Sequence, residues 1–565
     1  MVHTRTRTSV WMVLALLGFC LPPQSFCSVS CSVIHHPAPT EADKAFLAAD
    51  YAKAENLYRS ALAANPGDVD LTLGLVHALL RDQKVEEAAG TVNRALTASP
   101  ASAALLTLRG EVELRAGEPW TASQTAQKSM DIDPCNPRTL LLFAHLFDIS
   151  SNYASSRRYL TIAHRLDPDD PEIRQGWMLA LPVKERIPAI EAYLAEPRGD
   201  DAEDLRHLTE YLQHLRKLAS DPPKPCKLVS GTRSTELPIV YMMRDATHVL
   251  GLGLDVKLNN RTARLMVDTG VGGLLVSSAV AKRAGLSAFS DQHVGGIGDE
   301  KERKSFTTYA DSIRIGALEF QNCPVRVIDG QYMPGEMDGL IGTDVFSRFL
   351  VTLNYPARKL GLAPLPPRPG EEEGAGLRLS ADKDDEDEDA KKSAVSAPPG
   401  TADSAAPTPP SRSASRGPYD RYIAPEMKDY TKAYRVGHDL LLPARLNGDK
   451  IRLFILDTGS FATTISPKAA REVTKVYEDY STHIAGIDGE VKRVYSAREI
   501  TFRFANLSQK VDNVVAFDTA RISKEAGMEV SGLLGANTLF QVTMHIDYRD
   551  GLVKFDYDPK HNSPR

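Results

Sequence analysis

Two six-residue stretches decide the fold of this chain: residues 265–270 read LMVDTG, and residues 454–459 read FILDTG. In each stretch three apolar residues lead into Asp-Thr-Gly, the pattern of a buried strand that ends in a tight turn. The two aspartates, Asp268 and Asp457, stand 189 residues apart. One such tripeptide usually marks only a turn, but two copies behind matching strands indicate an internal repeat.

The sequence downstream of each aspartate repeats as well. A Gly-Leu-Ile-Gly run begins at Gly339, 71 residues after the first aspartate, and a Gly-Leu-Leu-Gly run begins at Gly532, 75 residues after the second. Thirteen residues past the last glycine of each run stands a tyrosine, Tyr355 or Tyr548. One such run alone predicts no more than a buried strand, but the shared spacing predicts two homologous lobes.

The two lobes resemble the pepsin and retropepsin family of aspartic peptidases. The resemblance implies two all-β lobes of the retropepsin-like acid protease fold, which supply one catalytic carboxylate each, Asp268 and Asp457. It also implies threonines that bond across the lobe interface, glycines that leave room for substrate, and a supporting serine in lobe two: Thr269, Thr458, Gly270, Gly459 and Ser460. Val271 departs from the family pattern, where serine, threonine or alanine is usual.

Glycine-rich segments downstream of each aspartate resemble the flap tips of retroviral proteases. A flap is a hairpin that closes over the cleft. The residues expected at the two tips are Gly295, Gly296, Ile297 and Gly298 in lobe one, and Gly486 and Ile487 in lobe two.

Two carboxylates suit the hydrolysis of a peptide bond by water. One must act as general base toward the water and the other as general acid toward the carbonyl oxygen and the leaving amine. Two carboxyl groups about 3 Å apart cannot both ionise and therefore share one proton, as in the aspartic-protease dyad, the best-known case. We therefore expect an aspartic endopeptidase whose substrate is a peptide or protein. The lobes could pair within one chain or between two chains of a homodimer, and the alternative function is an inactive peptide-binding scaffold.

A second repeat precedes the lobes. Four prolines, Pro66, Pro100, Pro134 and Pro168, are each 34 residues apart, and columns of small residues keep the same register. This period resembles the tetratricopeptide repeat, an array of paired helices that mostly binds peptides or proteins. The array is expected to recruit substrate or a partner protein, so its deletion should weaken cleavage of large substrates and spare short peptides. A helical bundle without recognition function is the alternative.

The fold prediction is therefore multidomain, an all-α tetratricopeptide solenoid followed by two all-β lobes. The expected segments are a signal peptide or targeting segment (residues 1–30), the helical domain (35–220), a linker (221–235), lobe one (236–365), a disordered acidic and proline-rich tether (366–425) and lobe two (426–560).

Composition limits the remaining classes. A net charge of −6 gives no electrostatic reason to expect a nucleic-acid partner. Basic residues before an apolar stretch of about a dozen residues predict an exported protein, with a cleaved signal or an uncleaved anchor. Lipidation of Cys31 is left open. The three cysteines beyond it, Cys135, Cys226 and Cys323, are expected to be thiols, and no metal site or cofactor is expected.

Overall fold

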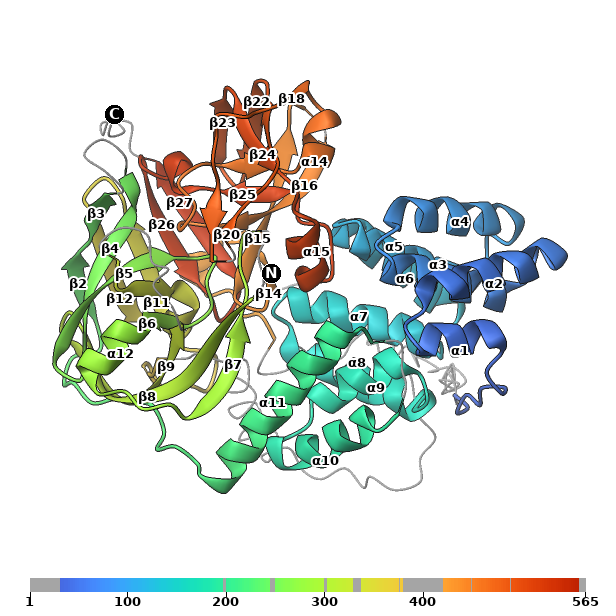
Figure 1. The fold of residues 1–565 in the computed structure, drawn as a ribbon, viewed down its shortest axis with the longest axis horizontal. Coiled ribbons are helices and arrows are strands. Elements are labelled where there is room, and N and C mark those ends of the chain that lie inside the picture. Colours follow the sequence, from blue (N-terminus) through green and yellow to red (C-terminus); the bar gives the residue numbers. More distant parts are fainter. Residues whose placement is uncertain are drawn as a thin grey trace, which may run out of the picture.

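The computed structural model describes residues 31–196, 200–243, 249–298, 302–328, 337–374, 376–379, 420–448, 450–487 and 489–557. The predicted targeting segment, residues 1–30, and the middle of the predicted tether, residues 380–419, lie outside these described residues. In the described part, a helical array stands beside two β-rich lobes (Figure 1).

Helices α1 to α11 make up the array, and their ends follow from local sequence. The prolines of the 34-residue repeat each stand two positions past the end of a second helix, where proline cannot continue the hydrogen-bond ladder. Side chains such as Asp68 and Asn136 cap the following helices. The helices are α1 (Glu41–Leu47), α2 (Tyr51–Ala64), α3 (Val69–Arg81), α4 (Val85–Ala98), α5 (Ala103–Arg115), α6 (Pro119–Ile132), α7 (Pro137–Ile149), α8 (Tyr153–Leu166), α9 (Pro171–Leu179), α10 (Val183–Leu194) and α11 (Ala202–Ser220).

Lobe one is built on a nine-stranded sheet. Its apolar strands alternate buried and half-buried side chains, as β8 shows. The elements are β1 (Lys227–Leu228), β2 (Thr235–Pro238), β3 (Val240–Met243), β4 (Val249–Leu258), β5 (Arg261–Asp268), β6 (Leu274–Ser277), α12 (Ser278–Ala284), β7 (Ser290–Val294), β8 (Arg303–Ile315), β9 (Leu318–Ile328), β10 (Gly339–Gly342), the 3₁₀ helix η1 (Thr343–Phe346), β11 (Phe349–Asn354) and β12 (Lys359–Pro364).

Lobe two repeats this plan on a ten-stranded sheet. Its elements are η2 (Pro425–Met427), β13 (Thr431–Lys432), β14 (Tyr434–Val436), β15 (Asp439–Leu446), β16 (Lys450–Leu456), β17 (Thr464–Ile465), α14 (Pro467–Arg471), β18 (Val476–Glu478), β19 (Ala485–Gly486), β20 (Gly489–Glu490), β21 (Val494–Ala497), β22 (Ile500–Phe504), β23 (Leu507–Val511), β24 (Val514–Phe517), α15 (Ala520–Ala526), β25 (Gly532–Leu534), η3 (Ala536–Thr538), β26 (Val542–Asp547) and β27 (Leu552–Tyr557).

The two sequence repeats occupy matching places in the two sheets. In lobe one β10 runs parallel to β5, and Gly342 stands opposite Asp268. In lobe two β25 runs parallel to β16, and Leu534 stands opposite Leu456, the residue before Asp457. The glycine-bounded runs are therefore buried strands beside the strands that lead to the aspartates.

A third sheet joins the lobes to each other. It has six strands in the order β13-β27-β26-β11-β12-β2. At its centre β11 of lobe one pairs antiparallel with β26 of lobe two, from Leu350 opposite Asp547 to Asn354 opposite Thr543. The lobes thus pair within one chain, the first of the two arrangements that the sequence left open.

Two disulfides correct the prediction of free thiols. Cys226 bonds to Cys323, and Cys31 bonds to Cys135. The prediction was wrong because counting Cys31 with the targeting segment leaves an odd number of cysteines. With its sulfur bonded to Cys135, Cys31 has no thiol left for a lipid.

Both predicted connectors also contain ordered parts of the lobes. In the predicted linker, residues 221–235, β1 lies antiparallel beside β9. At the near end of the predicted tether, residues 366–425, Arg368 is 7% exposed and bonds to the buried carboxylate of Asp550 at 2.7 Å. At its far end, the backbone N–H and hydroxyl of Ser155 in α8 donate to the carboxylate of Asp420. The extents predicted for linker and tether were therefore too long.

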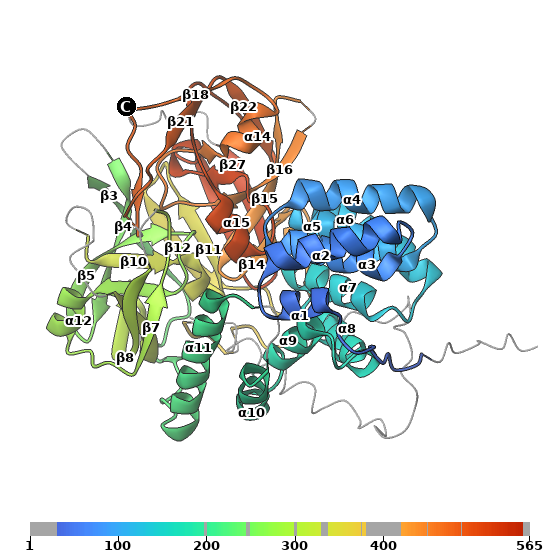
Figure 2. The same ribbon diagram turned by 45° about the vertical axis from the view of Figure 1, so that its right-hand side comes forward.

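The array packs directly against lobe two, where α5 to α7 face the α15 region (Figures 1 and 2). One apolar cluster crosses the boundary, with Leu114, Ala122, Ala126, Leu142, Phe143, Leu146 and Ile149 from the array and Leu441, Leu453, Ile455, Phe517, Met528, Val530 and Leu533 from lobe two. Backbone bonds accompany it, because Glu529 N–H donates to the carbonyl of Arg115 at 2.9 Å. The array is therefore fixed to the lobes as part of one packed body.

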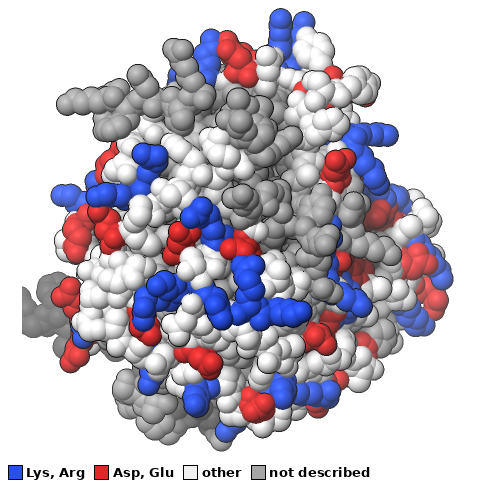
Figure 3. Space-filling view, turned by 60° about the vertical axis from the view of Figure 1, so that its left-hand side comes forward, with Lys and Arg blue, Asp and Glu red and all other residues white. Residues whose placement is uncertain are grey.

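Surface charge is mixed in sign. On the face in Figure 3, lysine and arginine side chains lie among aspartates and glutamates. Within the described part of the chain, no helix is long and apolar enough to span a bilayer.

Candidate active site

The two predicted catalytic aspartates lie close together at the interface between the lobes. Asp268 is the last residue of β5 and Asp457 follows β16, so two equivalent strands deliver them from opposite lobes. Asp268 is 9% exposed and Asp457 is 6% exposed. A Cβ atom placed on Gly459 would lie 2.2 Å from Oδ2 of Asp268, so only glycine permits this approach of the loops.

The two loops are locked together by their threonines. Thr269 N–H donates to Oγ1 of Thr458 at 3.0 Å, and Thr458 N–H donates to Oγ1 of Thr269 at 2.9 Å. Each hydroxyl in turn donates to a backbone carbonyl of the opposite lobe, Leu456 at 2.6 Å and Val267 at 2.9 Å. Because all four bonds cross the lobe interface and are buried, they hold the two aspartates in fixed relation.

The environment of the two carboxyl groups favours their protonated forms. Burial raises the pKa of Asp268 well above its usual range, and the nearby Asp457 charge raises it further. Burial also raises the pKa of Asp457. The pair therefore keeps a proton at a pH where isolated carboxyl groups have lost theirs.

The backbone around the two carboxyls is not symmetric. Asp457 accepts N–H bonds from Gly459 at 2.9 Å and Ser460 at 3.1 Å, whereas Asp268 accepts one from Gly270 at 2.8 Å. Val271 takes the place of Ser460 in lobe one and packs in an apolar cluster with Met266, Leu275 and Leu340. The extra N–H donor favours the negative charge on Asp457 and the proton on Asp268.

Two residues that the sequence reasoning missed hold the loops from behind. Asp344 accepts from the N–H of Gly273 at 3.0 Å, and Asn537 accepts from the N–H of Thr463 at 3.2 Å. Each stands two residues past the last glycine of its repeated run, Gly342 or Gly535. Extending the repeat alignment by two residues would have identified them.

A histidine and an aspartate at the β14–β15 turn also reach the interface between the lobes. His438 Nε2 lies 3.2 Å from the carbonyl oxygen of Gly270, and the carboxylate of Asp439 lies 3.5 Å from the same imidazole. Burial raises the pKa of Asp439 to about 6. No repeated motif in the sequence marks this turn.

The flap residues predicted from sequence in the two lobes meet at their tips. The Arg303 guanidinium donates to the carbonyl of Ile487 at 2.6 Å, which ties lobe one to the tip of the second flap. A Cβ atom on Gly296 would lie 2.8 Å from Cβ of Ile487, and one on Gly486 would lie 2.3 Å from the carbonyl oxygen of Ile297. Five of the predicted flap residues line the same cavity as the two aspartates: Gly295, Gly296, Ile297, Gly486 and Ile487. Gly298, with φ of 140°, lies beyond the tip.

The last array helix, α11, runs along the first flap (Figure 2). His214 Nδ1 lies 2.7 Å from Oγ of Ser290, and Glu210 lies 2.8 Å from Nδ1 of His293. Glu302, the residue before β8, accepts from Arg206 and pairs with His207 at 3.0 Å. The helical domain therefore contacts the first predicted flap, β7 and the start of β8.

One cavity of about 2490 Å³ joins these parts. Both aspartates and both flap tips line it, and so do residues of α3, α5, α7, α9 and α11. It is large enough for an extended peptide, since small-molecule pockets measure about 300–1,000 Å³. Among the described residues, no group of three or more His, Cys, Asp and Glu side chains could hold a metal ion.

Comparison with known families agrees with this architecture. Residues 254–345 and 442–538 match the aspartyl protease family, and residues 45–112 match the tetratricopeptide repeat family. No curated protein sequence matches the chain.

Solved structures with similarity to the chain include both kinds of protein. An aspartic proteinase from Irpex lacteus is 10% identical over 58% of this chain and 98% of its own, with a TM-score of 0.30. A tetratricopeptide repeat protein from Parabacteroides merdae is 19% identical over 30% of this chain and 66% of its own, just under two thirds, with a TM-score of 0.23. A thermophilic tetratricopeptide repeat protein from Thermus thermophilus is 17% identical over 31% of this chain and 95% of its own, with a TM-score of 0.25.

Proposed function

We propose that this chain, a tetratricopeptide repeat array joined to two lobes of the aspartyl protease family, is an aspartic endopeptidase that hydrolyses peptide bonds with water. The observation that carries the proposal is the buried pair Asp268 and Asp457, held face to face by the threonine bonds and open to a peptide-sized cavity. A shared proton gives such a pair a base and an acid at the same time.

The asymmetry of the pair suggests how the roles divide in the resting enzyme. Asp457, with two N–H donors, carries the charge and removes a proton from the attacking water. Asp268 carries the proton and donates it to the carbonyl oxygen of the scissile bond as the tetrahedral intermediate forms. At this point Asp457 holds a proton and Asp268 is ionised. As the C–N bond breaks, Asp457 passes its proton to the leaving amine and Asp268 takes a proton from a hydroxyl of the intermediate, which restores the resting state.

The test is hydrolysis of a broad peptide library by the purified protein between about pH 3 and 7, alongside Asp268→Asn and Asp457→Asn. We expect each substitution to lower kcat/KM by about 100-fold or more, because each removes one partner of the proton exchange. Activity of the unchanged protein should fall as pH rises through the upper pKa of the pair, where the shared proton is lost. Asp311→Asn, an exposed site in β8, is the matched control.

The second candidate is a binding scaffold without activity. Val271 favours it, since a valine cannot give Asp268 the hydroxyl contact that a serine or threonine offers there. Peptide binding without cleavage by the unchanged protein at every pH would support the scaffold. Cleavage that persists in either aspartate variant would contradict both the shared dyad and the proposed mechanism.

We also propose that the protein is exported and that its array recruits substrate. The two disulfides support export, because such bonds persist mainly in oxidising compartments. The cavity supports recruitment, because array helices and catalytic loops line the same space. Mass spectrometry after alkylation without a reducing agent checks the disulfides on which the export proposal rests. Four cysteines should remain unalkylated because they are bonded in pairs.

A further inference from the structure

The concave face of the helical array and the catalytic cleft are one space. The cavity that reaches Asp268 and Asp457 is also lined by Arg81 of α3, Arg115 of α5 and Glu172 of α9. A polypeptide that lies across the dyad and continues toward the array therefore meets charged side chains of the helices.

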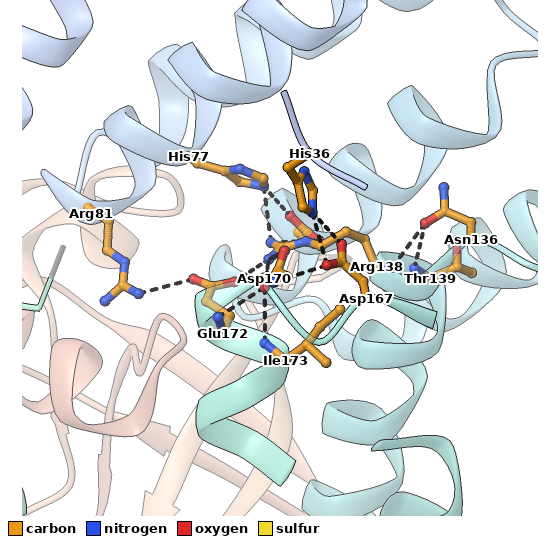
Figure 4. A network of polar contacts seen from close by, with 11 residues as sticks. His36, His77, Arg81, Asn136, Arg138, Thr139, Asp167, Asp170, Glu172 and Ile173 are labelled. Atoms are coloured by element: carbon orange, nitrogen blue, oxygen red, sulfur yellow. Dashed lines mark hydrogen bonds and ion pairs between the residues drawn. The ribbon is translucent and has the colours of Figure 1, made fainter. Parts of the chain in front are cut away.

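Most arginines in this part of the cavity already have carboxylate partners. Arg81 pairs with Glu172 at 3.2 Å (Figure 4). Arg138 lies in the middle of the same network and contacts Glu111 at 3.0 Å, Asp170 at 3.2 Å and Glu172 at 2.8 Å. These charges compensate one another within the array.

Arg115 is different, because no described carboxylate pairs with it. Its guanidinium donates to the carbonyl of Gly527 at 3.0 Å, and more weakly to the carbonyl of Leu80 at 3.5 Å and the amide oxygen of Gln83 at 3.3 Å. The Gly527 carbonyl belongs to lobe two, so this contact fixes the guanidinium at the seam between array and lobe. Burial lowers the pKa of Arg115. The charge of Glu172, which forms no ion pair with Arg115, raises this pKa, and the Arg81 charge lowers it.

A partly buried guanidinium with neutral acceptors alone is an incomplete site. Its planar group binds a carboxylate through two parallel N–H bonds, and such charge-assisted bonds are about twice as strong as neutral ones. A carboxylate delivered by a ligand would compensate the desolvated charge. Because the bond to Gly527 already holds the Arg115 guanidinium in place, less conformational entropy is lost when a carboxylate binds to it.

We propose that the concave face of the array is a continuation of the substrate cleft and that Arg115 binds a carboxylate of the substrate polypeptide there. The inference rests on the proposed endopeptidase function and names its substrate class. The substrates are extended polypeptides with a carboxylate on one side of the cleaved bond, at a fixed distance from it. The carboxylate can belong to an Asp or Glu side chain or to the C-terminus.

The experiment takes a short peptide that the full-length protein cleaves and extends it on either side with Gly and Ser. One Glu is moved along each extension and compared with Gln at the same position, and a C-terminal acid is compared with its amide. We expect one side and one narrow range of positions to give a kcat/KM about tenfold higher for the acid than for the neutral peptide. If the Glu and Gln peptides differ in this way, the carboxylate is a side chain. If the C-terminal acid and its amide differ, the carboxylate is the C-terminus.

The same ratio is then measured in protein variants. It should fall to about one in Arg115→Gln, remain above one in Arg115→Lys, and stay unchanged in Arg94→Gln, an exposed arginine on α4 outside the cavity. Because each ratio compares two peptides on one protein, a general loss of activity in a variant cancels. Thermal unfolding shows whether each variant is folded.

Binding of the same peptides to Asp268→Asn, measured by fluorescence anisotropy, separates recognition from cleavage. A preference for the acid in binding, lost in Asp268→Asn/Arg115→Gln, supports the carboxylate site even if no peptide is cleaved. Absence of cleavage alone counts against the endopeptidase. Equal binding and cleavage of acid and neutral peptides at every position, or a preference that survives in Arg115→Gln, overturns the carboxylate site.

Discussion

At the scale of residues, the buried pair Asp268 and Asp457 has a cost in folding free energy. Their pKa values are raised in the folded protein, so the folded state binds more protons than the unfolded state at neutral pH. The stabilisation from the bound proton is complete below the pKa that these carboxyl groups have in the unfolded chain. It is lost as pH rises through the higher pKa that they have in the folded protein.

Asp268→Asn should therefore raise the unfolding free energy at pH 7, by about 1 kcal/mol or more, and change it little near pH 3.5. The asparagine keeps the shape of the side chain and removes the free-energy cost of protonating this carboxyl when the chain folds at pH 7. Denaturant unfolding at the two pH values measures this, with Asp311→Asn as the exposed control. The same gain at both pH values would show that charge burial is not its source.

The sequence could predict the residues that recur and not those that depend on the fold. Asp268 and Asp457 are found because the same tripeptide follows the same apolar strand twice. His438 cannot be found in this way, since its approach to Gly270 is made across the lobe interface from a turn that no repeated sequence motif marks. Cys31 was missed for a similar reason, because its partner Cys135 lies 104 residues away in the helical array.

At the scale of elements, helix α11 acts on the first flap. Glu302, which is 14% exposed, joins β8 to Arg206 and His207 of α11. Because Arg206 and His207 are 37% and 44% exposed, each pair contributes about 0.2–1 kcal/mol. Their loss should free the flap from the helix.

Glu302→Gln should therefore speed amide hydrogen exchange in β7 and the first residues of β8 by several-fold, because local opening becomes less costly. Hydrogen-exchange mass spectrometry measures this on the full-length protein. Glu319→Gln is the control, as Glu319 pairs with Arg314 within the neighbouring hairpin of the same lobe. Unchanged exchange in β7 would show that the α11 pairs do not restrain the flap.

Local periodicity predicted the elements better than their partners. The 34-residue spacing of the prolines marks the ends of α2, α4, α6 and α8 correctly, since a proline cannot extend the hydrogen-bond ladder of the helix before it. The pairing of β11 with β26 and of β1 with β9 depends on contacts between distant segments, which no local pattern records. For this reason the predicted linker, residues 221–235, wrongly included strand β1 of lobe one.

At the scale of the whole molecule, the sequence predicts that the helical array and the lobes are separate domains, whereas in the structure they pack against each other. Distinct repeat periods predict distinct domains, and a free array would only recruit substrate. In the structure the array and lobe two share an apolar cluster that includes Leu142 and Leu146 on one side and Met528 and Val530 on the other. The array is then also a support for the strands that carry Asp457, because Ile455 belongs to the same cluster.

This changes what deletion of residues 31–220 should do. Removal of the array uncovers buried side chains of lobe two, and burial of each large apolar side chain contributes about 1.5–3 kcal/mol. We expect the remaining lobes to unfold at lower denaturant concentration or to aggregate, and to lose cleavage of short peptides as well as of long ones. Leu142→Ala in the full-length chain offers a milder version, with an expected loss of about 2–5 kcal/mol.

Solubility, denaturant unfolding and short-peptide cleavage of the deletion and of Leu142→Ala measure the effect. Leu106→Ala is a useful comparison, because Leu106 lies in α5 but packs within the array, away from lobe two. It should lower the stability of the array and leave the unfolding of lobe two unchanged. If the isolated lobes stay soluble and cleave short peptides at the full rate, the array only recruits substrate; if they do not, the catalytic unit includes the helices that wall its cleft.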